Sequence, residues 1–281
     1  MDAGYVMDDF LGIKTRSEFL GPPVERPVHE LCPPPNEEYF EWINLLESVA
    51  AAGDKYTMME LGAGYGRWAV RAARLVRLYR QIPFHLVAVE AEPRHFKWLE
   101  QHMRDNEIDP CEQRLLQAAV SDKRGEMLFY IARPEGGDNE AAEWYGQALT
   151  KSYEVVGKAG QTSYEGHEVL ELKSGWQTIR TECVLLKDIM PDVDRIDFID
   201  MDLQAEELKV VASAIDVLDS KAVRLHIGTH ERAIEDGLKE LLTAHRWECT
   251  MDYKCLETNV TPWGPVNFID GAQSWVNPRL A

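Results

Sequence analysis

Residues 58–68 read MMELGAGYGRW, and this stretch decides the expected fold. An apolar run ends in an acid, Glu60, and glycines follow at positions 62, 64 and 66 before a helical pattern begins near Trp68. Glycines let the backbone turn sharply and approach a ligand closely, at the positive end of the helix that follows. The pattern therefore predicts a strand, a ligand-binding loop and a helix.

The glycine spacing distinguishes three classes of nucleotide site. A dinucleotide site requires G-x-G-x-x-G, but Arg67 stands where the third glycine belongs, and the G-K-[ST] triplet of phosphate-cradling loops does not occur. The remaining pattern, E-x-G-x-G-x-G, is the S-adenosylmethionine (SAM) arrangement, in which the acid receives the ammonium and the loop passes beneath the carboxylate and ribose. The cofactor residues expected from this loop are Glu60, Gly62, Ala63, Gly64 and Tyr65.

Short apolar segments alternate with amphipathic ones along the rest of the chain. The expected strands span residues 56–61, 84–90, 114–120, 196–202, 223–227 and 247–251, and helices are expected after Gly66, Pro93, Glu206 and Glu231. This alternation predicts an α/β fold, with a mostly parallel sheet and helices on both faces. Ligands of such sheets bind beyond the carboxyl ends of the strands.

A second acid stands at the end of the next expected strand, where LVAVE finishes in Glu90. A carboxylate at this place can accept hydrogen bonds from both hydroxyls of a ribose. Alternatively, Glu90 only caps the following helix. The remaining expected cofactor residues are Ala91, Ala118 and Ala119.

Four segments together resemble the FkbM-type SAM-dependent methyltransferases. They are ELGAGYGRWAV, VAVEAEP, LLQAAVSDKRGEMLFYI and IDFIDMDLQAEE, in the family's order, over roughly residues 56–247. The resemblance implies a class I methyltransferase (Rossmann-like) fold, SAM as cofactor, and O-methylation of hydroxyls on natural products or sugars. One departure is Ala205, which stands where the family usually has glycine after the D-[VIL]-[EQ] triplet.

The chain is expected to comprise an N-terminal arm and helix (residues 1–55) and a SAM-binding methyltransferase domain (residues 56–281). Closely spaced prolines predict that the arm runs extended over the surface, and Asn36 is expected to cap the helix after it. An insertion at about 133–181 departs from the strand–helix rhythm. We expect it to form a lid or hairpin near the site; an ornamental surface loop is the alternative.

Two polar pairs lie on the fourth and fifth expected strands. Asp200 and Asp202 share one face of a strand, as do His226 and His230. If the two strands are neighbours, Asp202 and His230 meet beside the methyl group. A neutral imidazole is the natural base near pH 7, and a carboxylate can orient it, so Asp202 and His230 are the predicted catalytic residues.

The same residues allow a second interpretation, a metal site. Asp202, His230 and Glu231, with Asp200 or His226, could hold Mg²⁺ or another divalent ion that lowers the pKa of the acceptor hydroxyl. In a third interpretation, the histidines are buried and satisfied by the backbone. The sequence leaves the three readings open.

The composition restricts the partners. The 281 residues include 48 Asp and Glu against 30 Lys and Arg, a net charge of −18, which disfavours nucleic acid and anionic membranes. The five cysteines form no C-x-x-C, and the chain has neither a signal-peptide pattern nor a long apolar run. We therefore expect a cytoplasmic protein without membrane or nucleic-acid partners, and a homo-oligomer is possible.

These features predict a SAM-dependent methyltransferase that transfers methyl in line to a hydroxyl of a small molecule, with assistance from His230 and Asp202. A metal-assisted O-methyltransferase is the first alternative. A nicotinamide-dependent or sugar-nucleotide enzyme and a non-catalytic binding protein on the same fold are the others.

Overall fold

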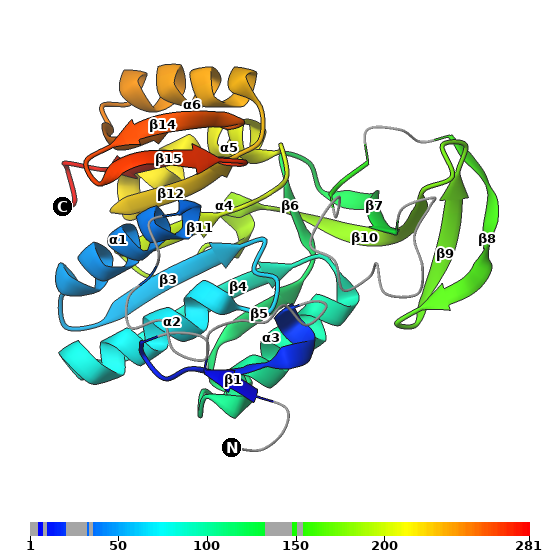
Figure 1. The fold of residues 1–281 in the computed structure, drawn as a ribbon, viewed down its shortest axis with the longest axis horizontal. Coiled ribbons are helices and arrows are strands. Elements are labelled where there is room, and N and C mark those ends of the chain that lie inside the picture. Colours follow the sequence, from blue (N-terminus) through cyan, green and yellow to red (C-terminus); the bar gives the residue numbers. More distant parts are fainter. Residues whose placement is uncertain (1–4, 8–9, 21–32, 34–35, 133–147, 151–153) are drawn as a thin grey trace.

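The computed structural model describes residues 5–7, 10–20, 33, 36–132, 148–150 and 154–281. Its centre is a seven-stranded sheet in the order β13-β16-β12-β11-β3-β4-β5 (Figure 1). The strands are β3 (Tyr56–Leu61), β4 (Phe84–Glu90), β5 (Arg114–Gln117), β11 (Phe198–Met201), β12 (Arg224–Thr229), β13 (Glu248–Tyr253) and β16 (Gly271–Val276). All run parallel except β16, which is antiparallel to both of its neighbours.

Helices cover both faces of this sheet, as the alternating sequence pattern predicts. One face carries α1 (Glu37–Ala50), α2 (Arg67–Leu75) and α3 (Pro93–Asp105); the other carries α4 (Leu186–Ile189), α5 (Glu207–Lys221) and α6 (Arg232–Ala244). Successive side chains of a strand point to opposite faces. Met58 accordingly packs in the core beneath the first set of helices and Met59 in the core beneath the second. The predicted α/β class is confirmed.

The third predicted strand, 114–120, is wrong as a single element. β5 ends at Gln117, and β6 (Ala119–Ser121) leaves the main sheet to pair in parallel with β10 (Gln177–Leu185). Ala118 N donates to Glu90 O at the break. The alanines expected at the cofactor therefore lie where the chain passes from one sheet to the other.

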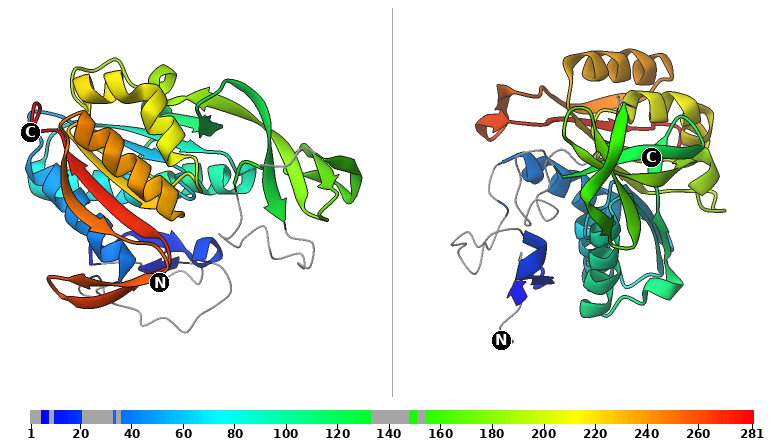
Figure 2. Two further views of the ribbon diagram at one scale, coloured as in Figure 1. Left: turned by 90° about the horizontal axis from the view of Figure 1, so that it is seen from above. Right: turned by 90° about the vertical axis from the view of Figure 1, so that its right-hand side faces the viewer.

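A second, five-stranded sheet extends from one end of the first (Figures 1 and 2). Besides β6 and β10 it contains β7 (Gly125–Ala132), β8 (Val155–Tyr164) and β9 (His167–Leu172). β8 and β9 form an antiparallel hairpin within the expected insertion. The structure thus contains the hairpin form of this segment, while residues 133–147 and 151–153 of the insertion lie outside the described part.

The N-terminal arm is more structured than its prolines predict. β1 (Tyr5–Met7) and β2 (Lys14–Arg16) form a small antiparallel pair, followed by a 3-10 turn, η1 (Ser17–Leu20). Phe19 of this turn is fully buried, with its ring 5.5 Å from that of Tyr65. Most of the proline-rich segment lies outside the described residues. Asn36 occupies the N-cap position of α1, but its side chain makes no capping hydrogen bond, contrary to expectation.

The C-terminal region covers α1 from outside. A hairpin of β14 (Glu257–Thr261) and β15 (Gly264–Phe268) lies beside α1 (Figure 2). It packs on Phe40 of α1, and the Phe40 and Phe268 rings lie 5.3 Å apart. α1 is therefore held between this hairpin and the main sheet. Among the described residues, no helix combines the length and apolar character needed to cross a membrane.

Candidate active site

The glycine loop after β3 has the conformation that its sequence predicts. Gly62, Gly64 and Gly66 all have positive φ, at 82°, 54° and 75°, a region that favours glycine. A Cβ atom on Gly62 would lie 1.9 Å from the carbonyl oxygen of Asp202. The loop therefore packs directly against the chain leaving β11, and any other residue at position 62 would separate them.

A cavity lies at the carboxyl ends of the parallel strands, beside this loop. Of the predicted cofactor residues, those that line it are Gly62, Gly64, Glu90, Ala91, Ala118 and Ala119, and the predicted catalytic Asp202 lines it as well. Glu60, Ala63 and Tyr65 are buried but are not among the lining residues. The structure thus brings most of the predicted residues to one place.

Glu60 is directed at α2. Its two carboxylate oxygens accept hydrogen bonds from Trp68 N (3.0 Å) and Ala69 N (2.8 Å), at the amino end of the helix. Burial raises the pKa of Glu60 to about 7, against the opposing effect of these two bonds. The strand-end acid that the sequence assigns to the cofactor's ammonium therefore anchors the helix behind the loop.

Glu90, at the end of β4, faces the cavity. One oxygen accepts from Gly64 N (2.6 Å) and the other from Glu92 N (2.7 Å). Burial raises the pKa of Glu90 to about 8. The alternative reading, in which Glu90 caps the next helix, does not hold, because Glu92 is the N-cap of α3 and accepts from His95 N (2.6 Å).

Several lining residues escaped the sequence interpretation. They are Val89, His95, Val120, Phe129, Ala148, Leu149, Leu203 and Gln204. Phe129 comes from β7 of the second sheet, whose position no local pattern indicates. His95 lies three residues after the N-cap Glu92, so its place in the helix start was a usable signal. Burial lowers the pKa of His95 to about 3, which leaves a neutral ring beside the cavity.

Asp202 and His230 meet as predicted, because β11 and β12 are parallel neighbours. Asp202 Oδ1 lies 3.3 Å from His230 Nε2, and the other ring nitrogen, Nδ1, lies 3.2 Å from Glu207 Oε1. Burial alone would lower the pKa of His230, but the two carboxylates outweigh it and raise this pKa to about 10. His230 is therefore an imidazolium near pH 7, in contrast to the neutral base expected from the sequence.

Glu207 is the residue of this cluster that the sequence did not indicate. It is fully buried, and its Oε1 also accepts from Leu203 N (3.0 Å) and Ala205 N (3.2 Å). Gln204 and Ala205 both have positive φ, 51° and 78°. Glu207 thus stabilises a backbone turn that an alanine adopts at some cost in energy.

The residues that could bind a metal differ from those suggested by the sequence. Within the described residues, Asp202, Glu207 and His230 place ligand atoms within 4.8 Å of one another. Glu231, which the sequence suggested as a ligand, instead occupies the exposed N-cap position of α6 and is not part of this group.

The main sheet decides the fold type. Six strands of this sheet are parallel, and the antiparallel β16 lies between the last two of them in the chain, β12 and β13. The glycine loop follows the first of the six, β3. This topology is the class I methyltransferase fold.

Known proteins resemble the chain at low sequence identity. No family model matches the chain. A curated protein from Jannaschia sp. (strain CCS1), described as "Putative methyltransferase", is 24% identical over 281 residues, covering 98% of this chain and 93% of that protein.

Solved structures resemble the chain more distantly. The methyltransferase FkbM from Methylobacillus flagellatus KT has 12% identity and a TM-score of 0.46; the match covers 79% of this chain and 44% of that one. The N-terminal domain of human METTL16 in complex with SAH has 11% identity and a TM-score of 0.42, covering 90% and 75%. The chain therefore spans less than half the length of the FkbM structure.

Proposed function

We propose that this protein transfers a methyl group from SAM to a hydroxyl group of a small molecule. The observation that carries the proposal is Glu90, a buried carboxyl that lines the cavity at the end of β4 while it orders the glycine loop through Gly64 N. The near full-length similarity to the Jannaschia protein supports methyl transfer as the reaction class.

The residues that line the cavity support SAM as the cofactor. Glu90 would accept hydrogen bonds from the ribose hydroxyls, Gly62 and Gly64 would leave room for close approach of the backbone, and Ala118 and Ala119 would flank the base with small side chains. When bound, SAM supplies an electrophilic methyl group on a sulfonium centre. In-line displacement depends chiefly on how the acceptor oxygen is positioned.

Asp202 is the group that can receive the acceptor. It lines the cavity, and the ion pair with His230 holds its pKa below the ordinary value against the opposing effect of burial. As a carboxylate it can accept a hydrogen bond from the acceptor hydroxyl, orient the oxygen and take up the hydroxyl proton as the new C–O bond forms, the methyl–sulfur bond breaks and SAH leaves. His230, held as an imidazolium between Asp202 and Glu207, fixes the orientation of Asp202. The proposed division is thus a contact role for Asp202 and a positioning role for His230.

The acceptor class follows from charge. A net charge of −18 repels polyphosphate chains at long range, so we propose a small acceptor and no nucleic-acid or membrane partner. Metal-assisted transfer would instead require Asp202, Glu207 and His230 as ligands, and chelation of the enzyme would then abolish turnover.

Calorimetry with SAM and SAH tests the cofactor proposal. Wild-type protein should bind both, and above pH 8, where Glu90 is ionised, Glu90→Gln should weaken SAH binding by about 1–3 kcal/mol, because a charged acceptor of two hydrogen bonds is lost. Affinity in the wild type should also rise with pH through about 8, where Glu90 ionises, and Glu90→Gln should lack this rise. Absence of binding by the wild type would overturn the proposal, and binding of a nicotinamide nucleotide instead would favour the dehydrogenase alternative.

A further inference from the structure

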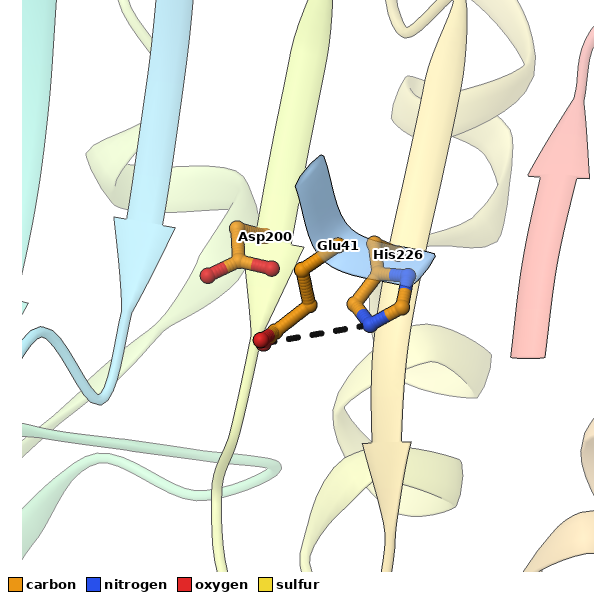
Figure 3. Close-up of side chains that lie close together, drawn as sticks. All are labelled: Glu41, Asp200 and His226. Atoms are coloured by element: carbon orange, nitrogen blue, oxygen red, sulfur yellow. Dashed lines mark ion pairs between the residues drawn. The ribbon is translucent and has the colours of Figure 1, made fainter. Parts of the chain in front are cut away.

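A second group of ligand-type side chains lies beneath α1, apart from the residues that line the cavity. Asp200 of β11, His226 of β12 and Glu41 of α1 place a carboxylate oxygen or ring nitrogen within 4.8 Å of one another. Figure 3 shows Glu41 reaching down from the helix to the two strand residues, with its carboxylate 3.8 Å from His226 Nε2. Asp200 and His226 are direct cross-strand neighbours in the sheet register.

Asp200 lacks the partner that a buried carboxyl normally has. Its exposed fraction is 5%, and within the described part of the chain its carboxylate makes no hydrogen bond or ion pair. The charged groups that act on it most strongly, Glu60 and Asp202, are also acids. Buried carboxyls in proteins are ordinarily paired, hydrogen-bonded or bound to metal, because burial without a partner is costly.

His226 is oriented as a ligand by neutral neighbours. Asn44 Nδ2 lies 2.9 Å from Phe40 O and 2.7 Å from Ser274 Oγ, and these two contacts use both of its hydrogens. Ser274 Oγ can then accept from His226 Nδ1, 3.1 Å away. With its proton on Nδ1, the ring presents the lone pair of Nε2 to Glu41. In metal-bound histidines, the ring nitrogen that does not bind the metal typically donates a hydrogen bond, as Nδ1 of His226 does here.

We infer that Glu41, Asp200 and His226 form a binding site for a divalent first-row metal ion of the Mn²⁺ or Zn²⁺ type. Two carboxylates and one neutral imidazole are a ligand set for such ions. The positive charge would compensate the buried Asp200 carboxyl and the partly exposed Glu41 carboxyl beside it. The ion would connect α1 to β11 and β12, two residues before Asp202 along the chain.

The site has a route to solvent. The side chain of Glu41 is 24% exposed, whereas His226 is 3% exposed, so an ion would enter from the Glu41 side. Since none of the three side chains lines the cavity, metal binding here does not depend on SAM, and the inference can fail while the proposed function stands.

Metal-free protein, prepared with a chelator, should be titrated with Mn²⁺ by electron paramagnetic resonance and with Zn²⁺ by calorimetry, in the absence of SAM. The wild type should bind one ion per chain, and its melting temperature should rise with the metal. Glu41→Gln and His226→Gln should each weaken binding by about tenfold or more. Glu41→Gln alters a partly exposed residue of α1 and should fold even if His226→Gln does not.

Two matched controls decide the location of the ion. Glu47→Gln changes an exposed acid on the same helix, and His230→Gln disrupts the other carboxylate–histidine group. Both should bind metal as the wild type does. Loss of binding in His230→Gln but not in Glu41→Gln would place the ion at Asp202, Glu207 and His230 and overturn the inference, as would a wild type that binds neither ion.

Discussion

Two groups with the same three residue types lie close together in this protein and differ in charge. In each group, the aspartate lies in β11 or directly after it, the histidine lies in β12 or directly after it, and the glutamate lies in a helix. The inner group is Asp200, His226 and Glu41; the outer group is Asp202, His230 and Glu207. Burial lowers the pKa of His226 to about 3, whereas carboxylate partners raise the pKa of His230 to about 10.

The difference lies in the hydrogen-bond partners of each ring. His230 contacts carboxylates through both nitrogens, at 3.3 and 3.2 Å. His226 has neutral neighbours, Asn44 and Ser274, at one nitrogen, and its nearest carboxylate is 3.8 Å from the other. Partners rather than residue types thus decide whether the histidine is a cation that orients a carboxylate or a neutral ring able to bind metal.

The largest expected effect is a loss of turnover when the outer group is disrupted. His230→Gln should slow methyl transfer by about 100-fold, because Asp202 loses the cation that orients it. The dissociation constant of SAH should stay within about threefold of the wild-type value. SAH release measured with a panel of hydroxyl compounds supplies the rate. A variant with wild-type turnover would remove His230 from the mechanism.

The pH dependence of stability should separate the two histidines. The pKa of His230 is raised on folding, so its stabilising contribution is complete below about pH 6.5 and is lost as pH rises through 10. The stability advantage of the wild type over His230→Gln should therefore fall by on the order of 4 kcal/mol between these values. Urea unfolding at several pH values, with chelator present, measures it.

His226→Gln serves as the control in the same titration. The pKa of His226 is lowered on folding, so its contribution is present above about pH 6.5 and declines only as the pH falls toward 3. The gap between the wild type and His226→Gln should stay constant from pH 6.5 to 10. Equal slopes for the two variants would contradict the contrast between the groups.

A smaller change should make His230 resemble His226. Glu207→Gln replaces the carboxylate at Nδ1 by a neutral amide and should lower the pKa of His230 by about one unit or more. The ring proton shifts of His230, followed by NMR across the pH range, give the value directly. An unchanged pKa would mean that Asp202 alone holds the charge.

The smallest expected effect concerns the turn between the two groups. Ala205 has a φ of 78°, and glycine adopts this conformation without the cost of a Cβ atom. Ala205→Gly should therefore stabilise the protein by about 0.5 kcal/mol in chemical unfolding. A destabilised variant would show that the packing of the Ala205 methyl group against the core beneath α5 stabilises the protein by more than the backbone conformation costs.

Local sequence patterns were sufficient for the order of the elements and the place of the site. The limits of β3 and β4 match the expected strands residue for residue, because each is a short apolar run with a clear end. The convergence of Asp202 and His230 also followed from strand periodicity once neighbouring strands were assumed. The break between β5 and β6 did not, because it depends on pairing with β10, some sixty residues later.

The sequence by itself determined a glycine loop, acids at two strand ends and an α/β alternation, since these are properties of consecutive residues. Tertiary structure decided which acid faces the cavity: Glu60 meets the amino end of α2, and Glu90 does not. It also decided the charge of His230, through the buried Glu207 of α5. Hydrogen-bond partners and desolvation come from distant elements, so contacts and protonation could be settled only by the fold.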